Sequence, residues 1–170
     1  ALLKTSPDAK LLAGGQTLLP TLKQRLAQPS DLVDLAGIAE LRGIKAGGST
    51  VTIGATTRHG DVATNADVAK AIPALAKLAS GIGDPQVRNA GTIGGSLANS
   101  DPAADYPAAV LGLGATIHTN RRTIPADSFF KGLFETALQD GEIITKVEFP
   151  IPERAGYQKF ANPASRYAVV

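Results

Sequence analysis

Residues 92–105 read TIGGSLANSDPAAD, a glycine pair followed by small polar residues between two apolar runs in the middle of the chain. A stretch of this kind exposes many backbone amides, and those amides must find partners. A second glycine pair occurs earlier, in residues 11–20, which read LLAGGQTLLP. We expect both glycine loops to hold one anionic ligand, and this expectation determines the fold that we predict for the chain.

The residue pattern around each glycine pair supports an anion site. AGGQT follows a predicted strand and precedes a predicted helix, so backbone N–H groups and a helix N-terminus with a charge of roughly +0.5 point to one spot. Glycine lets a phosphate approach the backbone and permits positive φ angles. TIGGS offers the same features, with the hydroxyls of Thr92 and Ser96 as additional donors. One such loop is more often a simple turn, but two in different lobes fit a pyrophosphate bound in a cleft.

Composition excludes several classes of function. The 170 residues suffice for one domain or two small lobes, and no apolar run is long enough to span a bilayer. Lys and Arg number 17 against 15 Asp and Glu, without a basic cluster longer than Arg121-Arg122, so nucleic acid is not an expected partner. The chain contains no cysteine and cannot ligate an iron–sulfur cluster by itself. Absence of cysteine also suits a cytoplasmic location, which we expect.

The first 55 residues are predicted to form a small α/β lobe. Residues 10–13 and 31–35 are expected as strands, with a helix that starts after Thr17 as its N-cap, and a hairpin turns at residues 47–49. Residues 1–4 resemble the last turn of a helix, and the chain ends in an apolar segment of strand character. We therefore expect the sequence to be part of a longer polypeptide.

Residues 56–170 are predicted to form a larger α+β lobe. Apolar residues at helical spacing predict a helix over 67–83, with Pro73 near its start or at a kink. A long loop follows over 84–105, and a short apolar helix begins at Tyr106. Alternating polarity predicts strands over 115–120, 121–126, 142–151, 157–161 and 166–170. We expect a mostly antiparallel sheet with helices on one side.

Other sites for nucleotides or catalysis find little support. The chain has no P-loop, and Gly112-Leu113-Gly114 follows a helix and lacks the third glycine of a dinucleotide fingerprint. No nucleophile motif is present, so we expect no catalytic residue of the chain's own.

The polar side chains that could bind a metal ion are better explained by structural roles. Asn99, Asp101 and Asp105 do not have the spacing of a calcium loop, and Asp105 is expected to cap the following helix. His59 and His118 have no flanking ligand pattern and are expected to be ordinary structural histidines. We therefore predict no metal site.

The strings AGGQTLLP, IGDPQVRNAGTIGGSLANSDPAAD and SRYAVV resemble the FAD-binding (medium) subunit of the molybdenum hydroxylases, the carbon monoxide dehydrogenase and xanthine dehydrogenase family. The resemblance covers essentially the whole chain. It implies the two-lobed FAD-binding fold named after p-cresol methylhydroxylase and vanillyl-alcohol oxidase, with lobes at 1–55 and 56–170. Relatives continue into a C-terminal domain that these residues do not include.

The resemblance also implies the residues that bind FAD non-covalently. Both glycine loops would grip the pyrophosphate, Asp105 would bind the nucleotide, Ile82 and Ile144 would pack near the flavin, and Lys159 would lie at its edge. The full set implied is Leu12, Ala13, Gly14, Gly15, Gln16, Thr17, Leu18, Ile82, Thr92, Ile93, Gly94, Gly95, Ser96, Asp105, Ile144 and Lys159.

The function that the resemblance implies is that of an electron-transfer oxidoreductase subunit. A large partner subunit would carry the molybdenum cofactor and a small one the [2Fe-2S] clusters, in a dimer of heterotrimers, and FAD would pass electrons to an external acceptor. Two alternatives are a flavin-free scaffold subunit of the same complex and a self-sufficient FAD oxidase. The oxidase usually needs a covalent flavin link, for which the glycine loops offer neither Cys nor His.

Overall fold

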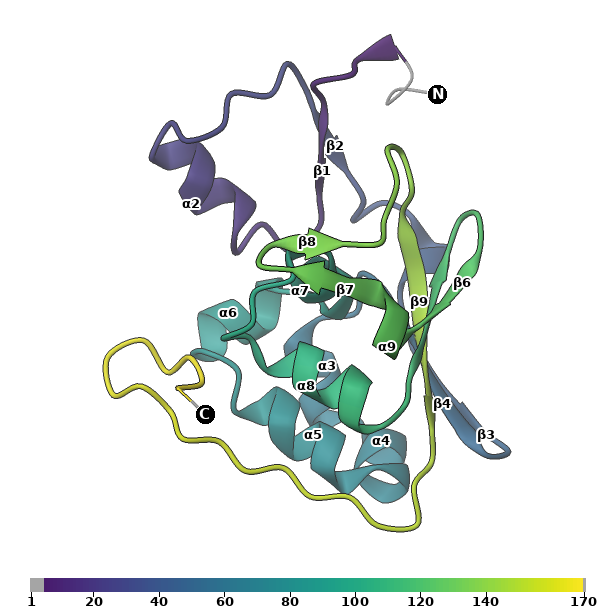
Figure 1. Cartoon of the computed structure of the whole chain (residues 1–170). Coiled ribbons are helices and arrows are strands. Elements are labelled where there is room, and N and C mark those ends of the chain that lie inside the picture. Colours follow the sequence, from purple (N-terminus) through teal and green to yellow (C-terminus); the bar gives the residue numbers. More distant parts are fainter. Residues whose placement is uncertain (1–4, 170) are drawn as a thin grey trace.

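The protein, described here by a computed structural model, is organised in two lobes over residues 5–169, so the helical turn expected at residues 1–4 lies outside the described residues. The small lobe consists of the parallel strands β1 (Lys10–Leu12) and β2 (Leu32–Asp34) and helix α2 (Leu18–Lys23) (Figure 1). Both strands confirm the predicted ones. Thr17 occupies the N-cap position of α2 as expected, but its side chain makes no capping hydrogen bond.

The larger lobe contains a five-stranded sheet in the order β3-β4-β9-β5-β6, antiparallel at every pairing. Its strands are β3 (Ile44–Gly47), β4 (Thr50–Gly54), β5 (Thr116–Thr119), β6 (Thr123–Pro125) and β9 (Ile144–Pro150). The mostly antiparallel sheet was predicted correctly. The β3–β4 hairpin, however, belongs to this sheet and not to the small lobe, because β4 pairs with β9 along its whole length.

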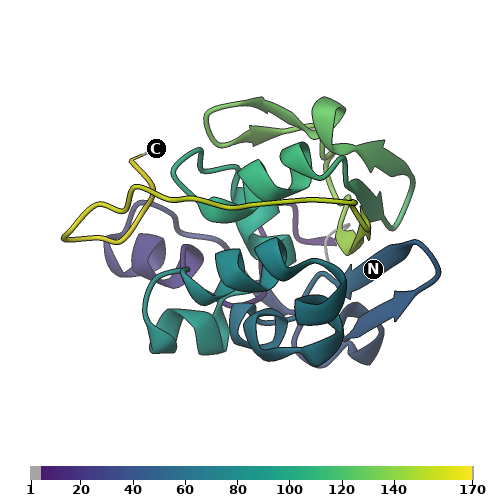
Figure 2. The ribbon, with the colours of Figure 1, turned by 90° about the horizontal axis from the view of Figure 1, so that it is seen from below.

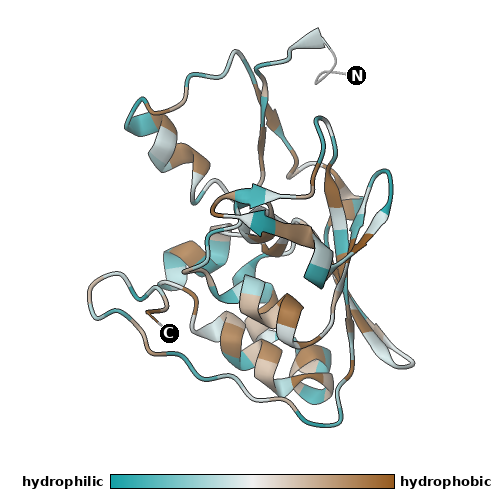
Figure 3. Cartoon of the chain, viewed as in Figure 1, coloured by the Kyte–Doolittle hydropathy of each residue, from teal (hydrophilic) through white to brown (hydrophobic). Residues whose placement is uncertain are grey.

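Alternating side chains explain why one face of this sheet is buried. Val51 and Ile53 on β4 and Val147 on β9 are fully buried, while Thr52 and Glu148 between them point to the other, more open face. Strand β9 lies in the middle of the sheet and contains the fully buried Phe149 next to its last residue. Apolar segments of the helices lie on the same side of the sheet as this core (Figure 3).

Helices cover one face of the sheet (Figure 2). They are a 3₁₀ turn at Ala39–Leu41, α3 (His59–Thr64), α4 (Ala66–Ala71), α5 (Pro73–Ser80), α6 (Pro85–Ala90), α7 (Ile93–Asn99), α8 (Asp105–Gly112) and α9 (Ala126–Phe129). The single helix predicted over 67–83 is in fact two helices, because Pro73 cannot continue α4 and instead begins α5. The predicted loop over 84–105 is also wrong, since it contains α6 and α7.

Helix α7 is the element that joins the glycine motif to the core. It lies against β4 and β9, and its residues Ile93 and Leu97 are fully buried. Gly94 allows this contact, because a Cβ there would lie 2.6 Å from the Cβ of Ala55. Packing against the sheet therefore forms a helix in a sequence whose glycines disfavour one.

The chain after β9 is extended, but residues 157–161 and 166–169 do not form the predicted strands, and residue 170 of the second one lies outside the described residues. It runs across the helices (Figure 2), and its pairing is an isolated bridge between Ala161 and Ala168. A small hairpin, β7 (Phe130–Gly132) with β8 (Glu135–Thr136), lies between α9 and β9 in the sequence. Within the described residues, none of the helices combines the length and hydropathy needed to cross a bilayer.

Candidate functional site

A cavity of about 850 Å³ is bounded by residues of both lobes, a volume within the range of about 300–1,000 Å³ usual for cofactor sites. Both predicted glycine loops line it. Of the predicted site residues, the cavity is lined by Ala13, Gly14, Gly15, Gln16, Thr17, Leu18, Ile82, Thr92, Gly94, Gly95, Ser96, Asp105 and Ile144. Leu12, Ile93 and Lys159 are not among its lining residues; Ile93 is fully buried in the core.

The first glycine loop offers unused backbone donors. The N–H groups of Gly14, Gly15, Gln16 and Thr17 donate to no acceptor within residues 5–169. Gly15 has a φ of 71°, a left-handed conformation that glycine adopts without strain. Successive amides in such a turn form a concave anion-binding nest. The first loop thus has the structure that we expected of a phosphate-binding loop.

The second glycine loop differs from the expectation, because its amides are already bonded. Ile93 N–H donates to the Thr57 carbonyl, Gly94 N–H to the Ala55 carbonyl at 2.8 Å, and Gly95 N–H to Thr92 Oγ1 at 3.2 Å. Amides that anchor α7 to the sheet are not available to a ligand. The second loop can instead contribute hydroxyl groups, because Ser96 Oγ has no hydrogen-bond partner in the described chain and Thr92 can still donate its proton.

The two glycines of each pair have different roles. A Cβ at Gly14 would overlap the carbonyl oxygen of Ala90, and one at Gly94 would overlap Ala55, so these two glycines allow close packing within the protein. A Cβ at Gly95 would meet only Thr92 Oγ1 at 2.9 Å and the Cβ of Ala13 at 4.0 Å. Gly95 is therefore the glycine of the second loop whose missing side chain leaves space on the cavity side.

Acidic side chains around the cavity are all engaged. Asp84 and Asp101 accept hydrogen bonds from the backbone amides of Val87 and Ala103. Glu142 binds Arg122 through both carboxylate oxygens, at 3.0 and 3.1 Å, and this hydrogen bonding lowers the pKa of Glu142 to about 2. Among these three carboxylates, Glu142 has its negative charge offset by the guanidinium of Arg122.

Two basic side chains at the cavity wall have no such partner. Lys10 on β1 and Arg166 in the C-terminal segment line the cavity, and neither side chain makes a hydrogen bond or ion pair among the described residues. Their positive charges remain available to attract a phosphate-bearing ligand.

Asp105 does not cap α8 as expected. Helix α8 starts at Asp105 without a capping side chain, and the carboxylate of Asp105 accepts from Tyr157 Oη at 2.5 Å and from Lys159 Nζ at 2.9 Å. The family resemblance implied that Asp105 and Lys159 belong to one site, and the structure joins them as a largely buried ion pair beside the cavity. One cavity-lining carboxylate is thereby neutralised.

His59 is a lining residue that the sequence did not identify. The imidazole is 5% exposed, and burial lowers its pKa to about 4. No local motif marks it, because its position depends on the approach of α3 to Gly91, residues far apart in sequence. His118, by contrast, lies on β5 next to Glu148 and does not line the cavity.

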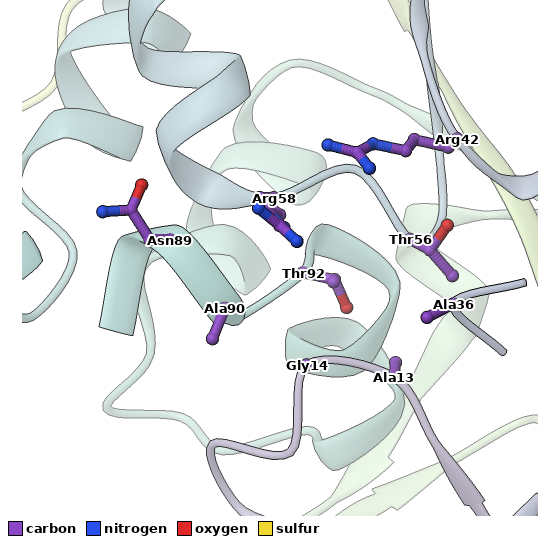
Figure 4. A pocket seen from close by; sticks show the side chains of 9 residues that line it. All are labelled: Ala13, Gly14, Ala36, Arg42, Thr56, Arg58, Asn89, Ala90 and Thr92. Atoms are coloured by element: carbon purple, nitrogen blue, oxygen red, sulfur yellow. The ribbon is translucent and has the colours of Figure 1, made fainter. Parts of the chain in front are cut away.

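A smaller hollow of about 190 Å³ lies next to the cavity and shares Ala13, Gly14, Thr56 and Thr92 with it. Figure 4 shows Arg42 and Arg58 at this hollow. Arg42 is paired with Asp61 at 3.2 Å, and the guanidinium of Arg58 has no partner in the described part of the chain.

Together these features define a domain for an extended, phosphate-bearing ligand. The first loop provides free amides, Gly95 leaves space opposite, and apolar side chains such as Ile82, Val87 and Ile144 offer surfaces for flat rings. The residues present fit a dinucleotide such as FAD in size, charge and donor set.

Comparison with known proteins identifies the family. Residues 1–152 match the family described as "FAD binding domain in molybdopterin dehydrogenase", and the chain belongs to this family. It is 47% identical over 149 residues to the carbon monoxide dehydrogenase medium chain of Hydrogenophaga pseudoflava, covering 84% of this chain and 51% of that protein. It is 40% identical to the nicotine 6-hydroxylase medium subunit of Paenarthrobacter nicotinovorans, covering 99% of this chain and 61% of the relative.

Solved structures show the same fold. Quinoline 2-oxidoreductase from Pseudomonas putida 86 superposes with a TM-score of 0.94 at 39% identity, covering 98% of this chain and 60% of that chain. Carbon monoxide dehydrogenase from Hydrogenophaga pseudoflava superposes with a TM-score of 0.93 at 43% identity, covering 98% and 61%. The predicted α+β FAD-binding fold is thus confirmed. The chain spans about half to three fifths of the length of these relatives.

Proposed function

We propose that this chain is the FAD-binding unit of a molybdenum-containing hydroxylase and works in electron transfer. The proposal rests on four consecutive amides, Gly14 to Thr17, which have no acceptor among residues 5–169 and lie at a cavity of dinucleotide size. When bound, FAD supplies the redox chemistry by which electrons from iron–sulfur clusters of a partner subunit reach an external acceptor.

The residues of this chain would bind and orient the cofactor. The first loop would hold the diphosphate through its amides, and the hydroxyls of Thr92 and Ser96 would donate from the opposite side. Ile82 and Ile144 would pack against the ring systems. The ion pair between Asp105 and Lys159 would keep a buried carboxylate from repelling the diphosphate.

We also propose partners for the chain. The relatives are named as medium chains or medium subunits, which supports assembly with larger and smaller subunits. The large one would carry the molybdenum cofactor and the small one the iron–sulfur clusters, in a dimer of heterotrimers. Leu133 and Phe134, at the turn between β7 and β8, are 70% and 59% exposed, and apolar side chains of this size favour a protein contact. A cytoplasmic location accords with this assembly.

Visible absorption of the purified intact protein tests the cofactor assignment. We expect flavin bands as isolated or saturable uptake on addition of FAD. Gly95→Val should weaken FAD binding at least tenfold, because the new side chain would extend toward the cavity. Gly112→Val is the matched control, since a Cβ there meets nothing within 4 Å and Gly112 does not line the cavity.

Two results would contradict the proposal. Intact protein that takes up no FAD while still binding its partner subunits would be a scaffold. Equal FAD affinity in the Gly95→Val variant and the wild type would place the ligand elsewhere.

A further inference from the structure

His59 lies next to Gly91 and Thr92, the residues that lead into the second glycine loop. Its backbone N–H donates to the Gly91 carbonyl at 2.9 Å, and the preceding Arg58 forms an isolated β-bridge with Thr92. Helix α3 starts at His59 and is thereby attached to the segment that leads into α7. His59 is one of the residues that line the large cavity, together with Gly91 and Thr92.

Two neighbours fix the orientation of this ring. A Cβ at Gly91 would lie 2.6 Å from His59 Nε2, so the ring occupies space that only a glycine at position 91 leaves free. On its other side the ring packs against Tyr106, with ring centroids 5.3 Å apart and an interplanar angle of 43°. Glycine and tyrosine thus hold the imidazole with Nε2 on the Gly91 side.

The surroundings also determine which nitrogen carries the proton. The ring is neutral near pH 7, because burial lowers its pKa to about 4. Nδ1 is fully buried and has no hydrogen-bond partner among the described residues. A buried N–H without an acceptor is rarer in proteins than an unfilled acceptor, so the proton belongs on Nε2.

We propose that His59 is a ligand-binding residue whose Nε2–H donates a hydrogen bond to a phosphate oxygen of the bound dinucleotide. The inference rests on the proposed function and adds a donor from outside the glycine motifs. It gives the second loop region a fixed N–H donor, which the first amides of α7 do not provide because they already donate to Thr57, Ala55 and Thr92. Nδ1 remains an unprotonated nitrogen within the core.

Nitrogen-15 NMR of the intact, untagged protein labelled at histidine tests this directly. The 170 residues contain two histidines, so His118→Gln separates the His59 resonances from those of His118. The two ring nitrogens have distinct shifts when protonated and when bare. We expect Nε2 protonated and Nδ1 bare, and a shift of the Nε2 resonance when FAD is added. A proton on Nδ1, or an Nε2 resonance that FAD leaves unchanged, would overturn the proposal.

FAD affinity of three variants provides the second test. His59→Leu removes the donor and should weaken FAD binding about tenfold or more, the effect of one hydrogen bond to a charged group. His59→Gln keeps an N–H donor and should retain most of the affinity, and His118→Gln should match the wild type. If wild type binds FAD and His59→Leu binds it equally well, this inference fails while the proposed function stands. If wild type binds no FAD, the proposed function itself fails.

Discussion

His59 and Glu142 make the stability of the folded chain depend on pH, in two separate windows. Burial lowers the pKa of His59 to about 4, and the Arg122 guanidinium lowers the pKa of Glu142 to about 2. Protonation of either group favours the unfolded chain, because the unfolded forms bind protons more tightly than the folded ones. The free energy of unfolding therefore decreases through protonation of His59 as the pH falls from 6.5 to about 4. It decreases through protonation of Glu142 as the pH falls from 4.5 to about 2.

The His59 window yields a prediction for single-residue variants. Stability contributed by the neutral ring is complete above pH 6.5 and decreases as the pH falls, by about 2 kcal/mol between pH 7 and pH 5. Urea unfolding of wild type and His59→Gln at both pH values would measure the difference. We expect a smaller loss of stability in the variant, since glutamine does not titrate. Equal losses in the two proteins would show that another group controls this window.

At the scale of elements, a buried ion pair attaches the C-terminal segment to α8. Asp105 at the start of α8 binds both Tyr157 and Lys159 of the segment, and Lys159 Nζ also donates to the Gly81 carbonyl at 3.3 Å after α5. Segment residues 164–167 line the cavity. The ion pair thus holds one wall of the candidate site in place.

Lys159→Met should loosen the attachment of the C-terminal segment to α8 and lower the stability of the fold. The substitution leaves a buried carboxylate with one partner fewer, and breaking a buried pair costs about 3–5 kcal/mol. Hydrogen exchange should become faster across residues 157–167, and unfolding should need less urea. The double variant Asp105→Asn with Lys159→Met removes the unpaired charge and should recover part of the stability. Unchanged exchange in the single variant would contradict this role of the ion pair.

The strands were easier to predict than the helices, for a physical reason. Alternation of polar and apolar residues predicted β5, β6 and β9, because each buries one face on the helices. Helix α6 was missed although Asp84 followed by Pro85 is typical of a helix start. Helix α7 was missed because its glycines disfavour a helix in isolation, and contacts such as that of Gly94 with Ala55 stabilise it. The segments at 157–161 and 166–170 have strand-like sequences, but within residues 5–169 their pairing with each other is an isolated bridge between Ala161 and Ala168.

The parts of the candidate site that depend on neighbouring residues in the sequence were the ones that could be predicted. The first glycine loop has a strand–turn–helix pattern that is visible in the sequence, and the structure gives it free amides. His59 and Tyr157 could not be found in this way, because their partners Gly91 and Asp105 lie 32 and 52 residues away along the chain. The bonded state of the α7 amides likewise depends on Ala55 and Thr57 in another part of the sequence.

At the scale of the whole molecule, the two lobes meet where Gly14 packs on Ala90. The cavity opens beside this contact and takes walls from both lobes, with β1 and α2 on one side and α7 on the other. A ligand that fills the cavity would therefore touch both lobes and hold them together.

FAD should stabilise the whole fold accordingly. At a free concentration about 100 times Kd, binding contributes about 2.7 kcal/mol, which corresponds to a rise in Tm of roughly 5–10 °C for a chain of this size. Circular dichroism during heating measures this rise. Riboflavin, which lacks the diphosphate, is the control and should give a much smaller rise. A rise with riboflavin equal to that with FAD would show that the glycine loops do not bind the diphosphate.

The unequal roles of the paired glycines bear on how such domains diverge. Gly14 and Gly94 are required by protein contacts, so a lineage that lost its cofactor would still be under selection to keep them. Gly95 would be less constrained, because a Cβ there would press only on the hydroxyl oxygen of Thr92, at 2.9 Å. A conserved GG pair is therefore only weak evidence that a related protein still binds FAD. After loss of the cofactor, substitutions would be expected first at Gly95, the second glycine of TIGGS.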